Sequence, residues 1–147
     1  MTLCSVKLEA ITSESFAPFG ALVDWTPALE KTGVPFHILV RSEAPTGWRM
    51  AMLKVALRAT QDMENHPHTE ELFAPVQGAG VLLVARAGAF DEGGVHAFFL
   101  DRPVSVGPGV WHGIFALSES ATVLIAENLD VTSEHAKLSR PSGAVLA

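Results

Sequence analysis

The chain has 147 residues, of which 48% are hydrophobic and 18% charged, and its formal net charge is −6. This length favours one domain, residues 1–147, which is long enough to bury a core without disulfides; the single cysteine cannot form an internal one. The acidic balance argues against nucleic acid as a partner. The sequence contains no signal-peptide pattern and no apolar run long enough to span a membrane, so we expect a soluble, cytoplasmic protein.

The predicted elements begin with one helical turn, which is followed by short strands along the rest of the chain. Thr12 or Ser13 is suited to cap a short helix that runs to about Ala17, where Pro and Gly residues end it. Beyond it, apolar segments of strand length are separated by Gly, Pro, Asp and Asn. The predicted strands are residues 21–25, 36–41, 48–59, 63–68, 72–76, 80–85, 95–100, 111–116 and 122–128.

The spacing of these segments favours an all-β fold. Strands about every ten residues, with turn signals between them, indicate a sandwich or barrel rather than alternating βαβ units. Residues 48–59 fit helical and strand periodicity about equally well, and their neighbours favour a strand. The tail 129–147 is predicted to be an irregular C-terminal arm outside a core of about residues 20–128. We therefore predict an antiparallel domain closed into a small barrel or jelly roll.

Two segments carry residue types that bind metals or move protons. In the first, His66 and His68 are two residues apart, so in a strand both imidazoles would point to one face, with Glu71 nearby. In the second, residues 107–113 form a tight turn that places His112 at the start of the next strand. Three imidazoles and a carboxylate are a suitable ligand set for a divalent transition metal.

Each of these residues also has a structural explanation. A His-x-His pair is often a surface feature, and Glu70 and Glu71 would fit a solvated turn. His112 is explained equally well as a hydrogen-bonded core histidine, and Trp111 beside it as core packing. Glu127 shares a strand face with apolar residues, so it either lines an internal cavity or marks the point where the strand reaches solvent.

The two segments together resemble the paired motifs of the cupin superfamily. The matching positions are His66, His68, Glu71, Gly78, Gly109 and His112. This chain has only two residues between the second His and the Glu, and it has Gly107 and Ala116 where the second motif has Pro and Asn. The resemblance implies a cupin, an RmlC-like jelly-roll β-barrel. It also implies one divalent transition metal (Zn, Mn, Ni or Fe) held by His66, His68, Glu71 and His112.

Within that superfamily, the chain resembles the ureidoglycolate lyase family, formerly called ureidoglycolate hydrolases. The likeness is carried, in the family's order, by residues 14–20, 63–67, 72–78 and 109–112. The family's ERHP stretch has Asn65 in place of its Arg, and Gly113 stands where a second His often follows Trp-His. The resemblance implies an enzyme of allantoin degradation, in purine catabolism, that splits ureidoglycolate into glyoxylate and urea. It also implies a homodimer, which a bare sheet edge would favour.

The implied reaction needs a base, an acid and a cation that binds the substrate carboxylate. His66 and His112 are the predicted acid and base, because histidine titrates near neutral pH, and Glu71 is predicted to act beside them or as a metal ligand. A guanidinium or ammonium group would bind the carboxylate. The predicted substrate-binding residues are Arg41, Arg49, Lys54 and Trp111.

Two other functions fit the same residues. A metal-dependent cupin would use His66, His68, Glu71 and His112 on another small carboxylate, as an isomerase, decarboxylase or oxygenase. A non-catalytic cupin would bind a small metabolite in the same barrel. In all three cases the expected partners are a small molecule and a second copy of the chain.

Overall fold

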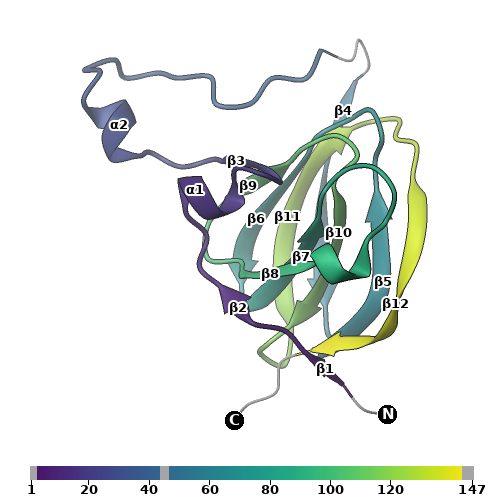
Figure 1. Cartoon of the computed structure of the whole chain (residues 1–147). Coiled ribbons are helices and arrows are strands. Elements are labelled where there is room, and N and C mark those ends of the chain that lie inside the picture. The colour runs from purple at the N-terminus through teal and green to yellow at the C-terminus, as the bar shows by residue number, and fades with distance from the viewer. Residues whose placement is uncertain (1–2, 44–46, 144–147) are drawn as a thin grey trace.

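A computed structural model describes residues 3–43 and 47–143 of the chain, which form two β-sheets (Figure 1). The seven-stranded sheet consists, in spatial order, of β1 (Cys4–Ser5), β12 (Glu134–Gly143), β5 (Ala59–Asn65), β10 (Trp111–Ala116), β7 (Gly80–Ala85), β8 (His96–Phe99) and β2 (Leu8–Glu9). The five-stranded sheet consists of β3 (Gly20–Leu22), β9 (Val104–Val106), β6 (Glu71–Gln77), β11 (Ala121–Asn128) and β4 (Trp48–Val55). The predicted all-β, jelly-roll-like architecture is confirmed.

The helices are short and lie outside the sheets. They are α1 (Ser13–Phe16), α2 (Pro27–Glu30) and a 3-10 turn, η1 (Glu92–Gly94). The predicted N-terminal turn is confirmed, because the Thr12 hydroxyl accepts a hydrogen bond from the Ser15 backbone N–H and caps α1. In the part of the chain that the structure describes, no helix is long and apolar enough to cross a membrane.

Most predicted strands are present, with shifts at their ends. The segments 72–76, 80–85, 95–100, 111–116 and 122–128 each overlap one strand over most of their length. The predicted strand 48–59 is β4 followed by a turn and the first residue of β5, and 21–25 is shortened to β3. The predicted strand 36–41 is wrong, because these residues pair with none of the described strands and lie in the connection between α2 and β4.

The predicted irregular C-terminal arm is also wrong. Residues 134–143 form β12, whose register on β5 is antiparallel with an irregularity between Lys137 and Ser142. Leu138 of this strand is buried, and Ile11 and Phe16 are buried as well, so the core extends beyond residues 20–128 on both sides. Alternation of apolar residues is weak in this stretch, which explains why the sequence did not indicate the strand. Residues 144–147 of the predicted arm lie outside the described residues.

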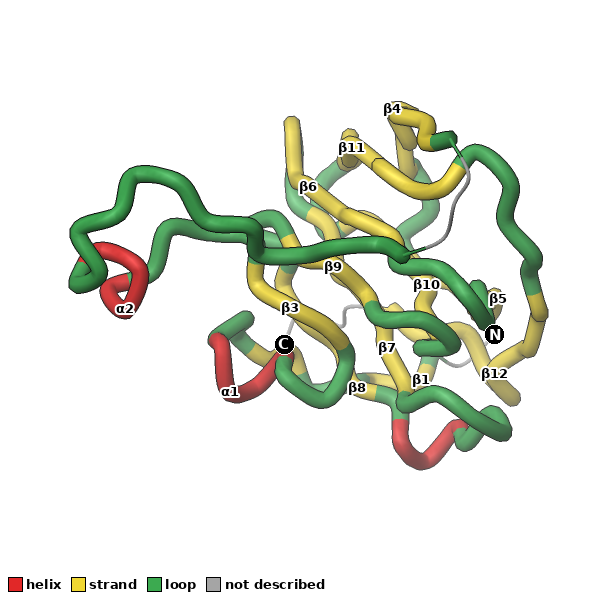
Figure 2. Tube along the Cα trace, turned by 90° about the horizontal axis from the view of Figure 1, so that it is seen from above, coloured by secondary structure: helices red, strands yellow, loops and turns green. Residues whose placement is uncertain are grey.

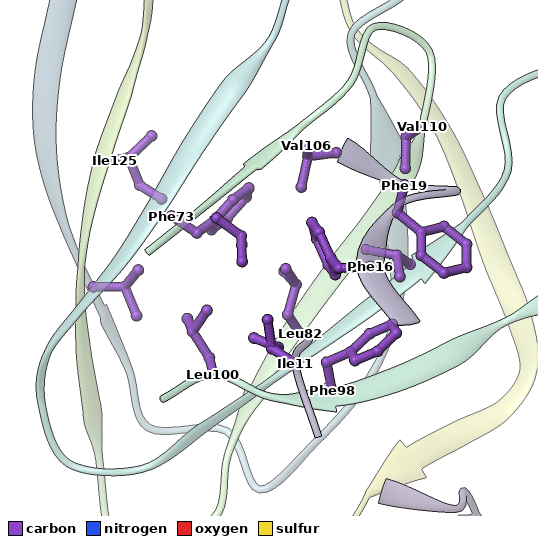
Figure 3. Packing of buried hydrophobic residues seen from close by; sticks show 13 residues of the cluster. Ile11, Phe16, Phe19, Phe73, Leu82, Phe98, Leu100, Val106, Val110 and Ile125 are labelled. Atoms are coloured by element: carbon purple, nitrogen blue, oxygen red, sulfur yellow. The ribbon is translucent and has the colours of Figure 1, made fainter. Parts of the chain in front are cut away.

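Three apolar clusters of buried residues stabilise the fold, and the two larger ones lie on opposite faces of the seven-stranded sheet. The cluster between the sheets includes Phe16, Leu82 and Phe98, and its packing is visible in Figure 3. The second cluster lies on the opposite, outer face of the seven-stranded sheet and includes Met63 and Trp111. Because successive residues of a strand point to opposite faces, neighbouring residues of β5 and β10 face different environments.

Candidate active site

Three of the predicted site residues, His66, Glu71 and His112, gather at one end of the space between the sheets. Glu71 is the first residue of β6, His112 is the second residue of β10, and His66 directly follows β5. Glu127 of β11 is opposite Glu71 in the antiparallel register, and Glu64 of β5 is opposite His112. Strand pairing therefore brings side chains from four strands to one place.

A tight turn connects the two histidine segments directly. Gly109 has φ = 74°, a backbone conformation that favours glycine, and its N–H donates a hydrogen bond of 2.8 Å to the carbonyl of His66. The His66 and His112 rings consequently lie with their centroids 5.3 Å apart. The turn between residues 107 and 110 thus positions His112 relative to His66.

Glu71 is the centre of the site. Its Oε2 atom lies 3.0 Å from Nε2 of His66 and 2.9 Å from Nε2 of His112, and all three side chains are at most 8% exposed. The other ring nitrogen of each histidine is held by the backbone. Nδ1 of His66 lies 3.2 Å from the Thr132 carbonyl, and Nδ1 of His112 lies 3.0 Å from the Val110 carbonyl. A carbonyl oxygen can only accept, so each of these contacts is a hydrogen bond when Nδ1 carries the proton. The Ser133 hydroxyl, 3.1 Å from Nδ1 of His66, can act as donor or acceptor there.

These contacts shift the ionisation of the cluster. Burial favours the neutral form of Glu71, but the close contacts with His112 and His66 lower the pKa of its carboxyl to about 2. The close contact with the Glu71 carboxylate raises the pKa of His66 to about 8, against the opposing effect of burial. At neutral pH the site therefore holds a carboxylate and a His66 imidazolium.

The arrangement also fits a metal ion. In a neutral imidazole whose Nδ1 carries the proton, Nε2 presents a lone pair to the carboxylate oxygen of Glu71. Two lone pairs repel each other, so this contact is favourable only with a proton or a metal cation between the two atoms. Glu71 Oε2 and His112 Nε2 are buried and have no well-directed hydrogen bond among the described residues. The ligand atoms of Glu64, His66 and His112 lie within 4.8 Å of one another, as do those of His66, Glu71 and Glu127.

His68 does not join this site. The expectation that His66 and His68 share a strand face is wrong, because β5 ends at Asn65 and residues 67 and 68 form a turn. His68 is exposed, and it belongs to neither of the two groups of potential metal ligands found in the described residues. Pro67 has no backbone N–H to donate to a sheet, and this favours the turn over a longer strand.

The predicted substrate-binding residues are dispersed. Arg49 points to the inner side of β4, where Nε and Nη2 donate hydrogen bonds of 2.9 and 2.6 Å to Oε1 of Glu127. Lys54 is exposed on the opposite side of β4, and Arg41 is exposed in the connection before it. Trp111 lies in the outer-face cluster, where its indole N–H donates to the Gly88 carbonyl, so strand alternation turns it away from His112.

The cavity beside the cluster has a volume of about 390 Å³ and is lined by His112 and Glu71 together with residues that the sequence did not indicate. Asp62 and Glu64 reach it from β5, and His135 reaches it from β12. Glu127 lines the inner space, since its Oε2 lies 3.7 Å from Nε2 of His66. Spacing within β5 would have indicated Asp62 and Glu64, because they alternate with His66, whereas His135 depends on a strand that was not predicted.

Two departures from the family motifs lie away from the cluster. Asn65 points to the outer face of the sheet, where its side-chain amide donates to Glu134 at 3.2 Å. Gly113 lies where β10 passes close to β5, and a Cβ atom at this position would be 2.5 Å from the Asp62 carbonyl oxygen. A histidine at residue 113 would therefore require the two strands to separate.

Comparisons with known proteins agree with these motifs. The sequence model described as ureidoglycolate lyase matches residues 4–139. The chain belongs to the ureidoglycolate lyase family. Its relatives in this family include proteins named ureidoglycolate lyase from Rhizobium etli, 27% identical over 83% of each chain, and from Burkholderia cepacia, 29% identical over 73% of this chain and 70% of the relative. Among solved structures, a dTDP sugar isomerase from Desulfovibrio desulfuricans has a TM-score of 0.44 at 17% identity, covering 74% of each chain.

Proposed function

We propose that this member of the ureidoglycolate lyase family cleaves ureidoglycolate to glyoxylate and urea, using His66 and His112 as acid and base. The observation that carries the proposal is the contact of both imidazoles with one buried carboxylate oxygen, that of Glu71, beside an open cavity. Family membership supplies the substrate class, and the cluster supplies groups able to move the two protons that the reaction requires.

The proposed step breaks the bond between the hydroxyl-bearing carbon and the ureido nitrogen. His112 removes the hydroxyl proton, the carbon–oxygen bond becomes the aldehyde of glyoxylate, and His66 protonates the departing urea nitrogen. A pKa of about 8 keeps His66 protonated at neutral pH, as a general acid requires. Glu71 holds both rings in place and stays ionised, so it keeps the proton on His66 until the leaving group develops negative charge.

Arg49 is the proposed partner of the substrate carboxylate. Of the predicted cationic residues Arg41, Arg49 and Lys54, it is the one in contact with the cluster, through Glu127. Nε and Nη2 are occupied by Glu127, but the side chain is 47% exposed, so the rest of the guanidinium can bind a second carboxylate. The expected effect of Arg49→Ala is a KM raised about 10–100-fold, with a smaller change in kcat.

A divalent metal ion is the second possibility, and the buried, poorly partnered Glu71 Oε2 and His112 Nε2 favour it. His66, His112 and Glu71 would hold the ion, with Glu64 or Glu127 as a further ligand. When bound, such an ion would act as a Lewis acid toward the hydroxyl or carboxylate oxygens of a small acid. With this metal, the same cavity would serve a metal-dependent enzyme acting on another small carboxylate.

The test is glyoxylate release from ureidoglycolate by purified protein, with and without a chelator. His112→Ala corrects for unaided decomposition, and His96→Ala is the matched control, because His96 is exposed on β8 and contacts Glu9 instead of the cluster. Release well above the His112→Ala rate that survives the chelator supports bare acid–base catalysis, and release that needs added metal supports the metal site. The absence of release under both conditions would overturn the lyase proposal.

We also infer that the protein assembles as a homodimer. The support is that β4 is the edge strand of the five-stranded sheet, with β11 as its one neighbour in the described residues. An unpaired edge strand invites association with another chain.

A further inference from the structure

Residues 23–43, here called the protruding segment, project beyond the two sheets around α2 and return to β11, where the Ser42 hydroxyl donates to Oδ1 of Asn128 at 3.5 Å (Figure 2). Figure 1 shows this part of the chain leaving β3, passing through α2 and returning toward β4. Figure 2, from above, shows the same projection beyond the sheets. Its large apolar side chains are unusually exposed: Phe36 by 76%, Ile38 by 62% and Val34 by 48%. Such residues rarely gather on the surface of a monomeric protein without a binding role.

The protruding segment is organised on one side only. His37 is half-buried, its Nε2 lies 2.9 Å from the Thr32 hydroxyl oxygen, and its ring lies 5.5 Å from that of Trp25. Phe36 and Ile38, on either side of it, are the two most exposed apolar residues of the segment. Both residues belong to the apolar run that predicted a strand over residues 36–41. One side of the segment contacts its own chain, and the other side is apolar and uncovered.

The outer face of β4 also exposes large apolar side chains. Trp48, Met50 and Met52 alternate along the strand and are exposed by 71%, 60% and 56%. Arg49 occupies the opposite face, where it pairs with Glu127, so the direction of the three apolar side chains is fixed. We call these three residues the β4 patch.

The combined area is sufficient for a stable dimer. The β4 patch and the exposed apolar residues of the protruding segment (Trp25, Val34, Phe36, Ile38, Leu39 and Val40) together offer roughly 1,000 Å² per copy, where a standard interface buries about 800 Å² per partner. Both surfaces belong to the same chain, so two copies related by a twofold axis would cover both at once.

We propose that a second copy of this chain covers these surfaces, with the protruding segment of each copy packed on the β4 patch of the other. The proposal concerns assembly: it specifies the contacts of the proposed homodimer and stands apart from the proposed reaction. A second copy explains why residues 36–41 pair with no strand in the described part of their own chain, since their apolar side would be covered only after association.

The first experiment measures molecular mass by sedimentation over a range of protein concentrations, without substrate. The wild-type chain is expected to be a dimer, and Phe36→Ser and Met50→Ser are each expected to weaken dimerisation by about tenfold or more. Leu8→Ser is the matched control, because Leu8 is 45% exposed on β2, away from both surfaces. Circular dichroism verifies that each variant is folded. A monomeric wild-type chain, or dimers unaffected by both substitutions, would overturn the proposal.

The second experiment identifies which surfaces meet. In a Cys4→Ser background, one preparation carries Ile38→Cys, and a second, differently tagged preparation carries Met50→Cys. Mixing and mild oxidation are expected to give a disulfide-linked pair containing both tags. If a chain that carries both cysteines instead closes the disulfide within itself, the segment folds onto its own β4, and the exchange between copies is refuted. Neither measurement uses glyoxylate release, so an inactive protein leaves this test intact.

Discussion

The two ends of the space between the sheets are built from the same strands and have opposite character. In β6, Phe73 belongs to the apolar cluster, while Glu71, two residues earlier on the same face, contacts His66 and His112. In β11, Ile125 is in the cluster, and Glu127 two residues later contacts Arg49. In both strands, therefore, a residue of the apolar core and a residue of the candidate site are only two positions apart.

The difference shows what a buried charge needs. At the apolar end, shape complementarity suffices, as in the edge-on contact of the Phe16 and Phe98 rings. At the polar end, the Glu71 carboxylate is tolerated because two imidazoles face it, since an unpaired buried charge is strongly destabilising. The rigid cluster beside it keeps the strands, and with them the three polar side chains, at fixed separations.

Removing the negative charge of Glu71 at the polar end should have the largest effect on activity. Glu71→Gln keeps the shape of the side chain but removes the charge that holds both imidazoles. We expect kcat/KM for glyoxylate release to fall by about 10²–10⁴-fold, the range typical of lost acid–base catalysis. Without the carboxylate, the pKa of His66 should also fall from about 8. NMR titration of the histidine ring protons measures this second effect independently of activity.

The neighbouring carboxylate is the matched control for this prediction. Glu70 precedes β6 and lines a separate hollow with Trp48 and Leu72 rather than the cavity beside His112. Glu70→Gln should leave kcat/KM within about twofold, as expected of a surface substitution. Equal losses in Glu70→Gln and Glu71→Gln would show that net charge, not the contact with the imidazoles, controls the activity.

Removing a buried side chain from the apolar end should instead lower the stability of the fold. Phe98 is fully buried between Phe16 and Phe19, so Phe98→Ala removes a whole ring from the core. We expect the free energy of unfolding in urea to fall by about 3–5 kcal/mol. Activity per folded molecule should change little at low temperature, because the site lies at the other end. Phe99→Ala, at a half-buried position, should cost less, and equal losses for the two variants would contradict the proposed core.

Much of this fold was accessible from the sequence. Residues 80–85 and 122–128 have strong apolar patterns bounded by turn residues, and both strands are present. The failures have physical reasons. Residues 36–41 form an apolar run of strand length, but such a run does not specify a partner strand, and the described part of the chain offers them none. Residues 134–143 lack clear alternation because their outer-face residues are partly polar, so tertiary pairing with β5 determines that strand.

The site was only partly accessible. Motif spacing indicated His66, Glu71 and His112, and the structure places them in contact. Glu127 remained ambiguous, because an acidic residue near a strand end is equally compatible with solvent. The salt bridge to Arg49 crosses 78 residues of sequence, and no local pattern carries such a pairing.

Raising the pH should lower the free energy of unfolding by a smaller amount, because His66 at the polar end loses its proton. Because the pKa of His66 is about 8 in the folded chain and near 6.5 otherwise, its protonation stabilises the fold fully below pH 6.5, and the stabilisation is lost as the pH rises through 8. The expected loss is on the order of 2 kcal/mol. Urea unfolding at pH 6 and pH 9 measures it, with His66→Gln as reference. If the variant lost the same amount of stability between these pH values, another group would be responsible.

The smallest effect should come from replacing His68, the second histidine of the His-Pro-His stretch. The motif predicted the same metal-binding role for His66 and His68. His66 is buried against Glu71, whereas His68 is exposed in the turn that follows β5. We expect His68→Ala to change the free energy of unfolding by less than about 0.5 kcal/mol and kcat/KM by less than about twofold. His66→Gln should resemble Glu71→Gln. A large loss of activity or bound metal in His68→Ala would mean that the turn closes over the site and that His68 binds beside Glu71 in the working protein. Metal analysis and glyoxylate release on the two histidine variants would decide between a site with two histidines and one with three.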